Sequence, residues 1–434
     1  MTAPTKGDQK PKVKPKLWAL MDCACFYCSC ERIFRPDLAN RPVVVLSNND
    51  GCVVAITPEA KALGFKRGEV FFKSKDRLLE AGVAVFSSNY ALYGDISRRV
   101  AMTMESVVPE IVQYSIDEAF IPFYGALAAQ AEEVGQTLLK RIGQWVGIPV
   151  RVGLGPTRTL AKLANHWAKK IGPVLKLELG SGLLEDLLAK TPLEDVWGVG
   201  HRLSARLSKM GLKTARDLRD LDHRKAAELF SVTLERTVLE LGGYQCVEDD
   251  LSPVARKTMV SSRSFAQAVT SVDELSEAIA YHCAVAGEKI RKEGLLAGTV
   301  SVYVSTGRYV ENPCHTGATV TLSRPSSSTA DFVKAAIGAL RHSFIPGPGY
   351  RKAGIMLLDL REKKSPLPSL LPPAPWVGQS DNLMRAMDQI NGRYGRNAIK
   401  FSVQGAQEPI WAMRQDRLSN VSTTDWDLLP QVTA

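Results

Sequence analysis

The sequence has no run of about eighteen consecutive apolar residues, so we expect no helix that spans a bilayer and no membrane partner. Residues 1–16 are rich in lysine and proline but lack the apolar core and cleavage site of a signal peptide. We expect this stretch to be a disordered basic tail. Four of the eight cysteines are scattered, without the regular framework of a small secreted protein, which predicts a reducing, cytoplasmic setting.

Acidic residues are in the minority, and this bears on the class of partner. The 434 residues include 55 Lys and Arg against 45 Asp and Glu, a formal net charge of +10. This balance favours a polyanionic partner, nucleic acid before a membrane surface. From charge alone, a basic surface without an assigned partner is an equally good interpretation. The hydrophobic content of 45% and a length sufficient for two to four domains indicate a globular protein.

The other four cysteines lie between Cys23 and Cys30, directly after Asp22. Their C-x-C-x2-C-x-C spacing differs from the paired C-x2-C loops of structural zinc sites, and no second pair of Cys or His is nearby. The segment also passes from a predicted strand into a predicted helix, which would place the sulfurs on different faces. We therefore interpret these cysteines as small buried hydrophobic residues and look to Asp22 for the function.

Apolar patterns and turn residues predict the elements that carry the candidate residues. Strands are expected over 17–22, 112–121 and 147–155, and a hairpin over 41–56 with an Asn-Asp-Gly turn. Helices are expected from Phe26, from Pro58 with Thr57 as the N-cap, and after Thr157 as the N-cap. Residues from about 192 predict helix, Gly-x-Gly turn and helix, and residues 257–361 predict a β-α-β-β-α-β unit.

Three carboxylates stand in apolar strand-like segments, namely Asp22, Asp117 and Glu118. Adjacent acids in a regular strand point to opposite faces, which would bury one of them unpaired. A bulge or a strand end would let both point to one place. If the two strands are neighbours, the three carboxylates form a cluster that two Mg²⁺ ions would neutralise, and these ions could organise phosphoryl transfer. The alternative is that these acids are ordinary strand-end charges in salt bridges.

Further motifs extend this pattern along the chain. They are Phe26-Tyr27, VVVLSNNDGCVVA (43–55), FSSNYALYGDIS (86–97), YSIDEAF (114–120), TLAKLANH (159–166) and DVWGVGHRLS (195–204). In this order and at this spacing, the chain resembles the Y-family DNA polymerases. The longer stretches resemble the UmuC-type catalytic subunits of DNA polymerase V. The resemblance extends over about residues 17 to 420.

The resemblance implies a multidomain fold of the α/β (α+β) class, shaped as a right-hand polymerase. After the tail at 1–16, it implies palm and fingers over 17–190, a helix-hairpin-helix thumb over 191–250 and a little finger over 251–361. A Pro-rich linker over 362–376 and a partner-binding segment over 377–434 would follow. The implied activity is error-prone, DNA-directed translesion DNA synthesis in the SOS response to DNA damage.

The resemblance also implies roles for single residues. Asp22, Asp117 and Glu118 match the catalytic carboxylates that bind two Mg²⁺ ions, with the Cys23 carbonyl as a backbone ligand. Tyr27 matches the steric gate that excludes a ribose 2′-hydroxyl, and Phe26 would shape the sugar pocket. Lys61 and Lys162 match basic residues that bind the triphosphate. In these polymerases the primer 3′-hydroxyl attacks the α-phosphate of the incoming dNTP.

One segment departs from the wider family, in which Ala-Thr-x-x-Tyr often precedes the basic residue. This chain has Ala55 and Pro58 at the positions of the two hydroxyl-bearing residues. Neither side chain can donate to a phosphate. We therefore expect the triphosphate to be bound less tightly, or by side chains elsewhere.

The DNA contacts are expected in the thumb and the little finger. Gly198, Gly200, Arg202 and Arg206 would bind phosphates from a helix-hairpin-helix, although a simple interhelical turn explains the glycines equally well. Arg263 is a candidate phosphate contact in the little finger.

The resemblance implies protein partners as well, namely a processed UmuD-type dimer and a RecA filament. The sliding clamp is a candidate partner through Leu367–Leu371, which lacks the glutamine of the usual clamp motif. Two alternatives of other classes stay open, a non-catalytic DNA-binding scaffold and a palm-type cyclase or nuclease.

Overall fold

The computed structural model describes residues 16–246, 256–307, 310–363, 376–395, 397–405, 413–420 and 423. The predicted tail, and the linker with its candidate clamp motif, lie almost entirely outside these residues. The chain forms two compact units. The first comprises the described residues of 1–47, 51–252 and 417–434, and the second those of 48–50 and 253–416. The finer domain boundaries, at 191 and 362, stay predictions.

A five-stranded sheet is the centre of the first unit. Its order is β5 (Val112–Gln113), β6 (Glu118–Phe123), β1 (Leu17–Cys23), β7 (Val150–Gly155) and β8 (Val174–Lys176). Strand β1 is antiparallel to both β6 and β7. Its side chains alternate between two hydrophobic clusters, with Ala19 and Met21 in one and Trp18 and Leu20 in the other. Both faces of the sheet are therefore covered.

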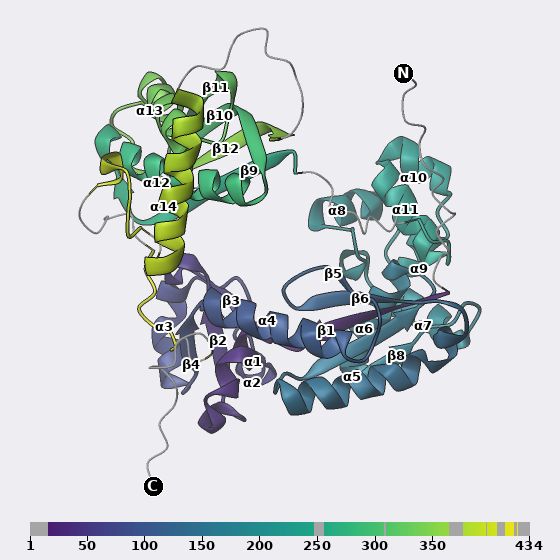
Figure 1. Ribbon diagram of the computed structural model, residues 1–434. Helices are drawn as coiled ribbons and strands as arrows, with labels where there is room; N and C mark the ends of the chain where they lie inside the picture. Colours follow the sequence, from purple (N-terminus) through teal and green to yellow (C-terminus); the bar gives the residue numbers. More distant parts are fainter. Residues whose placement is uncertain are drawn as a thin grey trace. The chain divides into compact units, whose positions relative to one another are not determined.

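Helices on opposite faces of this sheet provide the cover (Figure 1). Helices α4 (Tyr90–Glu105) and α5 (Ala131–Trp145) pack on the Met21 face, and α6 (Arg158–Ile171) packs on the Trp18 face. A Cβ on Gly153 would overlap backbone atoms of Asn165 and Ala161 in α6. Glycine in β7 is what allows α6 to lie this close to the strand.

The predicted strand over 112–121 is wrong as a single element. It is two strands, β5 and β6, that pair as an antiparallel hairpin around residues 114–117. The amides of Tyr114 and Ser115 both donate to the Glu118 carbonyl, at 3.0 Å, and close the turn. The polar Tyr-Ser-Ile-Asp segment supplies this turn without Gly or Pro, so the usual turn signals are missing.

A smaller three-stranded sheet in the first unit has the order β3 (Val53–Ile56), β2 (Val43–Leu46) and β4 (Ala84–Ser87). Strands β2 and β3 form the predicted hairpin. Helices α1 (Phe26–Ile33), α2 (Pro58–Ala62) and α3 (Phe71–Glu80) and the short 3₁₀ segment at 36–38 complete this region. The 3₁₀ segment at 48–50 is grouped with the second unit. The Thr57 hydroxyl accepts from the Ala60 amide, which confirms the predicted N-cap.

Short helices form the rest of the first unit. They are α7 (Gly182–Lys190), α8 (His201–Lys209), α9 (Ala215–Arg219), α10 (His223–Leu229) and α11 (Val232–Leu241). The helix predicted directly before the Gly-x-Gly turn is wrong, because only a 3₁₀ turn, Leu193–Asp195, lies there. Pro192 has no amide hydrogen, and the buried Leu193 and Val196 tie the segment down in a short turn. Gly198 has a φ of 88°, which favours glycine.

The second unit has the predicted β-α-β-β-α-β order. Its elements are β9 (Thr258–Val269), α12 (Val272–Lys292), β10 (Leu295–Ser305), β11 (His315–Ser326), α13 (Thr329–Ser343) and β12 (Tyr350–Glu362). The sheet order is β11-β10-β12-β9, and one cluster of buried side chains joins both helices to the sheet. Helix α14 (Trp376–Tyr394) lies beside α12 (Figure 1). The Arg291–Asp388 ion pair at 2.7 Å joins the two helices. Within the described ranges, no helix is long and apolar enough to cross a membrane.

Candidate active site

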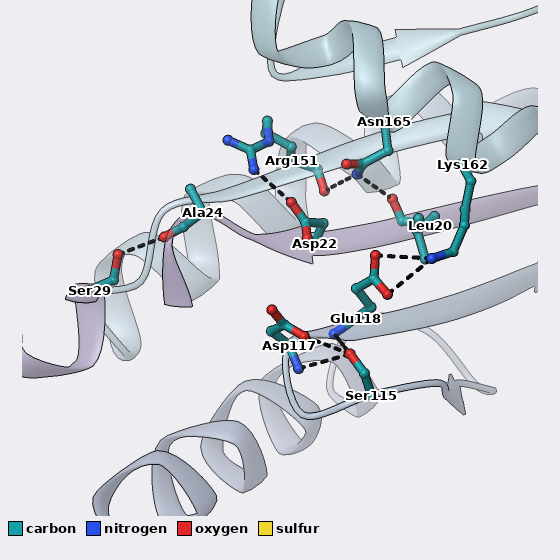
Figure 2. Close-up of polar contacts among 10 residues, drawn as sticks. All are labelled: Leu20, Asp22, Ala24, Ser29, Ser115, Asp117, Glu118, Arg151, Lys162 and Asn165. Carbon is teal, nitrogen blue, oxygen red and sulfur yellow. Dashed lines mark hydrogen bonds and ion pairs between the residues drawn. The ribbon is translucent and has the colours of Figure 1, made fainter. Parts of the chain in front are cut away.

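Three neighbouring strands place two acids and one base in a single row. Asp22 in β1 is paired with Glu118 in β6 on one side and with Arg151 in β7 on the other. Directly paired residues on neighbouring strands share one face. The row lies at the end of β1 that leads to α1 (Figure 2). The adjacency of the two acid-bearing strands, which the sequence left conditional, is therefore present.

Asp117 lies in the turn before β6, and Ser115 fixes its position. The Ser115 hydroxyl donates to Asp117 Oδ1 at 2.6 Å and accepts from the amides of Asp117 and Glu118 at 3.3 and 3.0 Å. The Cys23 amide donates to the Asp117 carbonyl at 2.9 Å, which joins this turn to the end of β1. A strand end, as predicted, thus brings Asp117 and Glu118 to the same region as Asp22 (Figure 2).

Two of the three carboxylates are held by basic side chains. Arg151 donates to Asp22 Oδ2 at 2.6 Å, and Lys162 donates to the two Glu118 oxygens at 3.1 and 3.2 Å. All four side chains are between 16% and 22% exposed. Burial raises the pKa of Asp22 above its usual value, against the lowering effect of the Arg151 guanidinium. Burial also raises the pKa of Glu118, and the negative charges of Asp22 and Asp117 add to the rise while Lys162 opposes it.

The predicted role of Asp22, Asp117 and Glu118 as metal ligands stays a prediction. Within the described part of the chain, no three His, Cys, Asp or Glu side chains are gathered closely enough to hold a metal ion. Asp22 and Glu118 contact Arg151 and Lys162 (Figure 2). The donor set suits Mg²⁺, because it consists of carboxylate oxygens, the ligands that this hard cation prefers.

A cavity of about 500 Å³ opens between the carboxylates and the small sheet. Asp22 and Asp117 line one end, and Phe26, Tyr27 and Lys61 line the rest with four neutral residues of the β3–α2 segment, Val54, Ala55, Ile56 and Pro58. The sequence placed these functional residues in one nucleotide pocket, and they do line one cavity. Lys169 and Arg67 also line it, although sequence reasoning had not selected them.

Tyr27 is stacked inside a group of aromatic rings. Its ring lies 4.4 Å from that of Tyr93, with an angle of 14° between the planes, and Tyr90 contacts both rings edge-on. Phe26 is buried behind Tyr27. These contacts hold the Tyr27 ring at the wall of the cavity.

Lys162 does not line the cavity that contains Tyr27. It lines a second cavity of about 600 Å³, on the α6 side, with Glu118 and Trp197. Its ammonium group lies 4.5 Å from the Tyr114 ring centroid and 5.3 Å from that of Trp197. Asp22 and Lys169 line both cavities. The triphosphate role of Lys162 stays a prediction, while Lys169 is the lysine of α6 that lines the cavity with Tyr27.

The cysteines pack as predicted. Cys23, Cys28 and Cys30 are buried and Cys25 is half-buried, and all four are free thiols. Burial raises the pKa values of the Cys28 and Cys30 thiols, which disfavours the thiolate form needed for metal binding.

The predicted DNA contacts lie in different settings. Gly198, Gly200 and Arg202 are exposed, and both glycines line the second cavity. Arg206 is exposed but donates to the Leu229 carbonyl at 3.0 Å and covers the Phe230 ring at 4.5 Å. Arg263, in β9 of the second unit, is half-buried over Tyr281. All five DNA-contact roles stay predictions.

Sequence reasoning missed Arg151 and Asn165 as well as Lys169. Asn165 in α6 donates to the carbonyls of Leu20 and Arg151 and so ties two strands of the row together. A signal for Arg151 was present, since it is the one charged residue in the apolar strand VRVGLG. A charge in such a strand calls for a partner.

Comparison with known protein families matches residues 21–166 to the impB/mucB/samB family and residues 256–370 to the C-terminal domain of that family. Residues 381–432 match a domain of unknown function. UmuC of Salmonella typhimurium strain LT2 is 42% identical over 95% of this chain and 99% of its own length. ImpB of Salmonella typhimurium is 40% identical over the same shares of the two chains.

Among solved structures, a Y-family DNA polymerase chimera of Dbh and Dpo4 superimposes with a TM-score of 0.63 and 18% identity. The match covers 80% of this chain and 99% of the chimera. The predicted polymerase fold is confirmed by this likeness, and the predicted UmuC-type resemblance by the relatives. Similarity to these relatives over nearly the whole chain shows that the protein belongs to the impB/mucB/samB family, of which UmuC is a member.

Proposed function

We propose that this protein is a DNA-directed DNA polymerase of the translesion type, which adds dNTPs to a primer 3′ end opposite damaged template bases. The observation that carries the proposal is the row of Asp22 and Glu118 on paired strands, with Asp117 beside them, next to a cavity lined by Tyr27 and Lys61. Family membership and the polymerase fold support it. In the reaction, the primer 3′-oxygen attacks the α-phosphorus and the bond to pyrophosphate breaks.

Asp22, Asp117 and Glu118, with the Cys23 carbonyl, are the groups that would hold two Mg²⁺ ions. Bound Mg²⁺ supplies the positive charge that lowers the pKa of the attacking hydroxyl and stabilises the leaving pyrophosphate. The chain's own part is to keep the three carboxylates in one region and to favour their ionised forms. Arg151 and Lys162 favour the ionised forms of Asp22 and Glu118, and Ser115 orients Asp117.

The nucleotide would occupy the cavity that contains Tyr27. Tyr27, supported by Phe26, would meet a ribose 2′-hydroxyl and so favour deoxynucleotides. Ala55 and Pro58 line this wall and offer no hydroxyl to the phosphates. The charge for the triphosphate would come instead from Lys61, with Arg67 and Lys169, which line the same cavity.

The remaining assignments concern DNA and partners. Exposed Gly198, Gly200, Arg202 and Arg206, with Arg263 in the second unit, are the proposed phosphate contacts. We place the activity in the cytoplasm during the SOS response, with a processed UmuD-type dimer and a RecA filament as partners. The sliding clamp would bind Leu367–Leu371, which lies outside the described residues.

Primer extension with Mg²⁺ and dNTPs, on intact and abasic templates, tests the proposal. Wild type, Asp117→Ala and Asp186→Ala are compared, with and without a UmuD-type dimer and activated RecA. Asp186 is an exposed acid in α7, paired with Lys190, and serves as the matched control. We expect extension by wild type and by Asp186→Ala, and loss in Asp117→Ala. A wild type that binds primer-template but extends it under no condition would favour a DNA-binding scaffold.

A further inference from the structure

A short segment near the C-terminus is fastened to the first unit by its backbone. The Ser87 amide, at the end of β4, donates to the Arg417 carbonyl at 2.9 Å, and the Arg417 amide donates to the Ser87 hydroxyl at 3.0 Å. The Arg417 guanidinium lies 5.7 Å from the Phe71 ring centroid. Both Ser87 and the following Ser88 are buried. The segment therefore has a defined place on this unit.

Asn89 connects the segment to the start of α4. Its side-chain oxygen accepts from the Leu92 amide and caps the helix. Its side-chain nitrogen donates to the Ser419 carbonyl at 3.1 Å, to the Ser419 hydroxyl at 3.0 Å and to the Asn420 carbonyl at 3.4 Å. Asn89 is only 2% exposed. The side-chain amide of Asn89 thus caps α4 with its oxygen and donates hydrogen bonds to the C-terminal segment with its nitrogen.

A chain of contacts leads from this segment to the nucleotide cavity. Ser419 forms a hydrogen bond with the side chain of Glu31, which is 3% exposed. The Tyr93 hydroxyl donates to Glu31 Oε1 at 2.6 Å. The Tyr93 ring is fully buried and stacks on Tyr27 at 4.4 Å. Tyr27 is the residue at the cavity wall.

We propose that Glu31 and Tyr93 are positioning residues for Tyr27 and that residues 417–420 complete their support, so that the C-terminal segment contributes to discrimination against ribonucleotides. This inference rests on the proposed polymerase function, because it assigns Tyr27 to contact with the sugar. It also gives a structural role to part of the region that matches a domain of unknown function.

The Tyr27 ring is supported by the Tyr93 ring, which stacks on it. A steric barrier rejects a 2′-hydroxyl only if the barrier cannot move away when the larger sugar enters. Tyr27 itself is half-buried, and its support comes from the flat face of Tyr93. Tyr93 is fixed in turn by the hydrogen bond that its hydroxyl donates to the buried Glu31 side chain at 2.6 Å. Removing residues 417–420 takes the Ser419 partner away from that carboxylate.

Asn89→Asp is the sharpest variant, because aspartate keeps the N-cap of α4 but cannot donate to Ser419 or Asn420. Tyr93→Phe keeps the stacked ring and removes the hydroxyl. Glu31→Gln keeps an acceptor for Tyr93 and is the conservative rescue of Glu31→Ala. Leu418→Ala changes an exposed side chain in the same segment and is the matched control.

Each full-length variant is assayed for dATP and ATP incorporation and for equilibrium binding of both nucleotides to the enzyme–primer–template complex. Trypsin cleavage after Arg417 reports release of the segment. We expect selectivity for dATP over ATP to fall about three- to tenfold in Asn89→Asp, Tyr93→Phe and Glu31→Ala, as the loss of one hydrogen bond allows. Glu31→Gln and Leu418→Ala should stay near wild type, and Arg417 should become cleavable in Asn89→Asp only.

Unchanged selectivity in Asn89→Asp with Arg417 cleaved would overturn the inference while leaving the polymerase proposal intact. Unchanged selectivity with Arg417 still protected would overturn it as well, because the fastening attributed to Asn89 would then be wrong. A wild type without dNTP incorporation would contradict the polymerase proposal, and the binding ratios would still test the link from Glu31 to Tyr27.

Discussion

At the scale of single residues, two of the three acids of the candidate site are paired with a base, one on a neighbouring strand and one on helix α6. Asp22 contacts Arg151, and Glu118 contacts Lys162, while Asp117 is held by the neutral Ser115. The basic partners stabilise carboxylates that burial would otherwise protonate more easily. Arg151 and Lys162 occupy carboxylate oxygens that would also hold Mg²⁺, so these two bases would compete with the cations for the same oxygens.

Tyr27→Ala should admit ribonucleotides, because the alanine leaves space where the ring stood. We expect selectivity for dNTPs over rNTPs to fall by about 10- to 200-fold, the range for discrimination by size alone. Incorporation of dATP and ATP by single-turnover kinetics measures the ratio. Tyr244→Ala, at an exposed tyrosine in the same unit, is the control. Wild-type selectivity in Tyr27→Ala would show that the steric-gate assignment is wrong.

Glu31 should make stability depend on pH. Burial raises its pKa in the folded protein, against the lowering by Tyr93 and Ser419. A carboxyl group with a raised folded pKa contributes stability that is fully present below its unfolded pKa, near 4.5, and is lost as pH rises through the folded value. Glutamine does not ionise, so Glu31→Gln does not lose stability as the pH rises. The thermal midpoint of the variant should therefore exceed that of wild type at neutral pH and differ little from it at pH 4.5. Equal gains at both pH values would contradict the assignment.

The sequence identified the site residues that belong to recognisable motifs. It missed the residues that enter the site only through strand pairing or helix packing. Asp22, Asp117 and Glu118 stand out because acids are rare in apolar strands. Arg151 joins them only through the pairing of β1 with β7, and Lys169 only because α6 crosses that sheet. A charge in an apolar strand marks Arg151 as a residue that needs a partner, but only strand pairing and helix packing bring Arg151 and Lys169 to the site.

At the scale of elements, the close packing of α6 against β7 sets the positions of the α6 side chains at the site. Helix α6 carries Lys162, Asn165 and Lys169 and begins at Thr157, whose hydroxyl accepts from Leu160 and donates to the Glu240 carbonyl at 2.8 Å. A change that lifts this helix would move all three side chains together.

Gly153→Ala should force this separation. Its Cβ would overlap backbone atoms of α6, and overlap with backbone cannot be relieved by a rotamer change. We expect a loss of about 3 kcal/mol in the free energy of unfolding. Gly143→Ala, at an exposed position of α5 with open space around it, should instead gain about 0.5–1 kcal/mol. Denaturant titration of both proteins gives the comparison, and equal stabilities would show that the contact is not tight.

Thr157→Ala should weaken the start of the same helix. The variant loses an N-cap and a buried hydrogen bond, and we expect a cost of about 1–2 kcal/mol in the free energy of unfolding. Ser181→Ala removes the cap of α7 at a more exposed site and should cost less. The order of the two unfolding midpoints in urea is the measurement, and a larger loss in Ser181→Ala would contradict the argument.

The elements themselves were largely predictable. The split unit 257–361 and the hairpin of β2 and β3 follow from alternating apolar residues and clear turn residues. The β5–β6 hairpin did not, because its turn contains Tyr-Ser-Ile-Asp rather than Gly or Pro. The segment at Leu193–Asp195 is too short for its sequence to distinguish a 3₁₀ turn from the start of an α-helix, because apolar residues three apart fit both.

At the scale of the whole molecule, the net charge of +10 should show itself in binding to primer-template. Each phosphate contact adds about 0.9 to the slope of log affinity against log salt concentration. Arg202→Ala should reduce the slope by about 1 if Arg202 binds a phosphate. Arg35→Ala is the control, because Arg35 is exposed but paired with Asp37 at 2.8 Å. Equal slopes for wild type and Arg202→Ala would remove Arg202 from the proposed interface.

The hydrogen bonds between Asn89 and Ser419 join positions that are 330 residues apart, and this separation has a consequence in time. At a synthesis rate of about 5–20 residues per second, Asn89 is made roughly 16 to 66 s before Ser419. The three carboxylates and Tyr27 are therefore translated long before residues 417–420, which contact Asn89. A chain still on the ribosome, or one cut short before codon 417, would carry the catalytic carboxylates without the hydrogen bonds between Asn89 and the C-terminal segment.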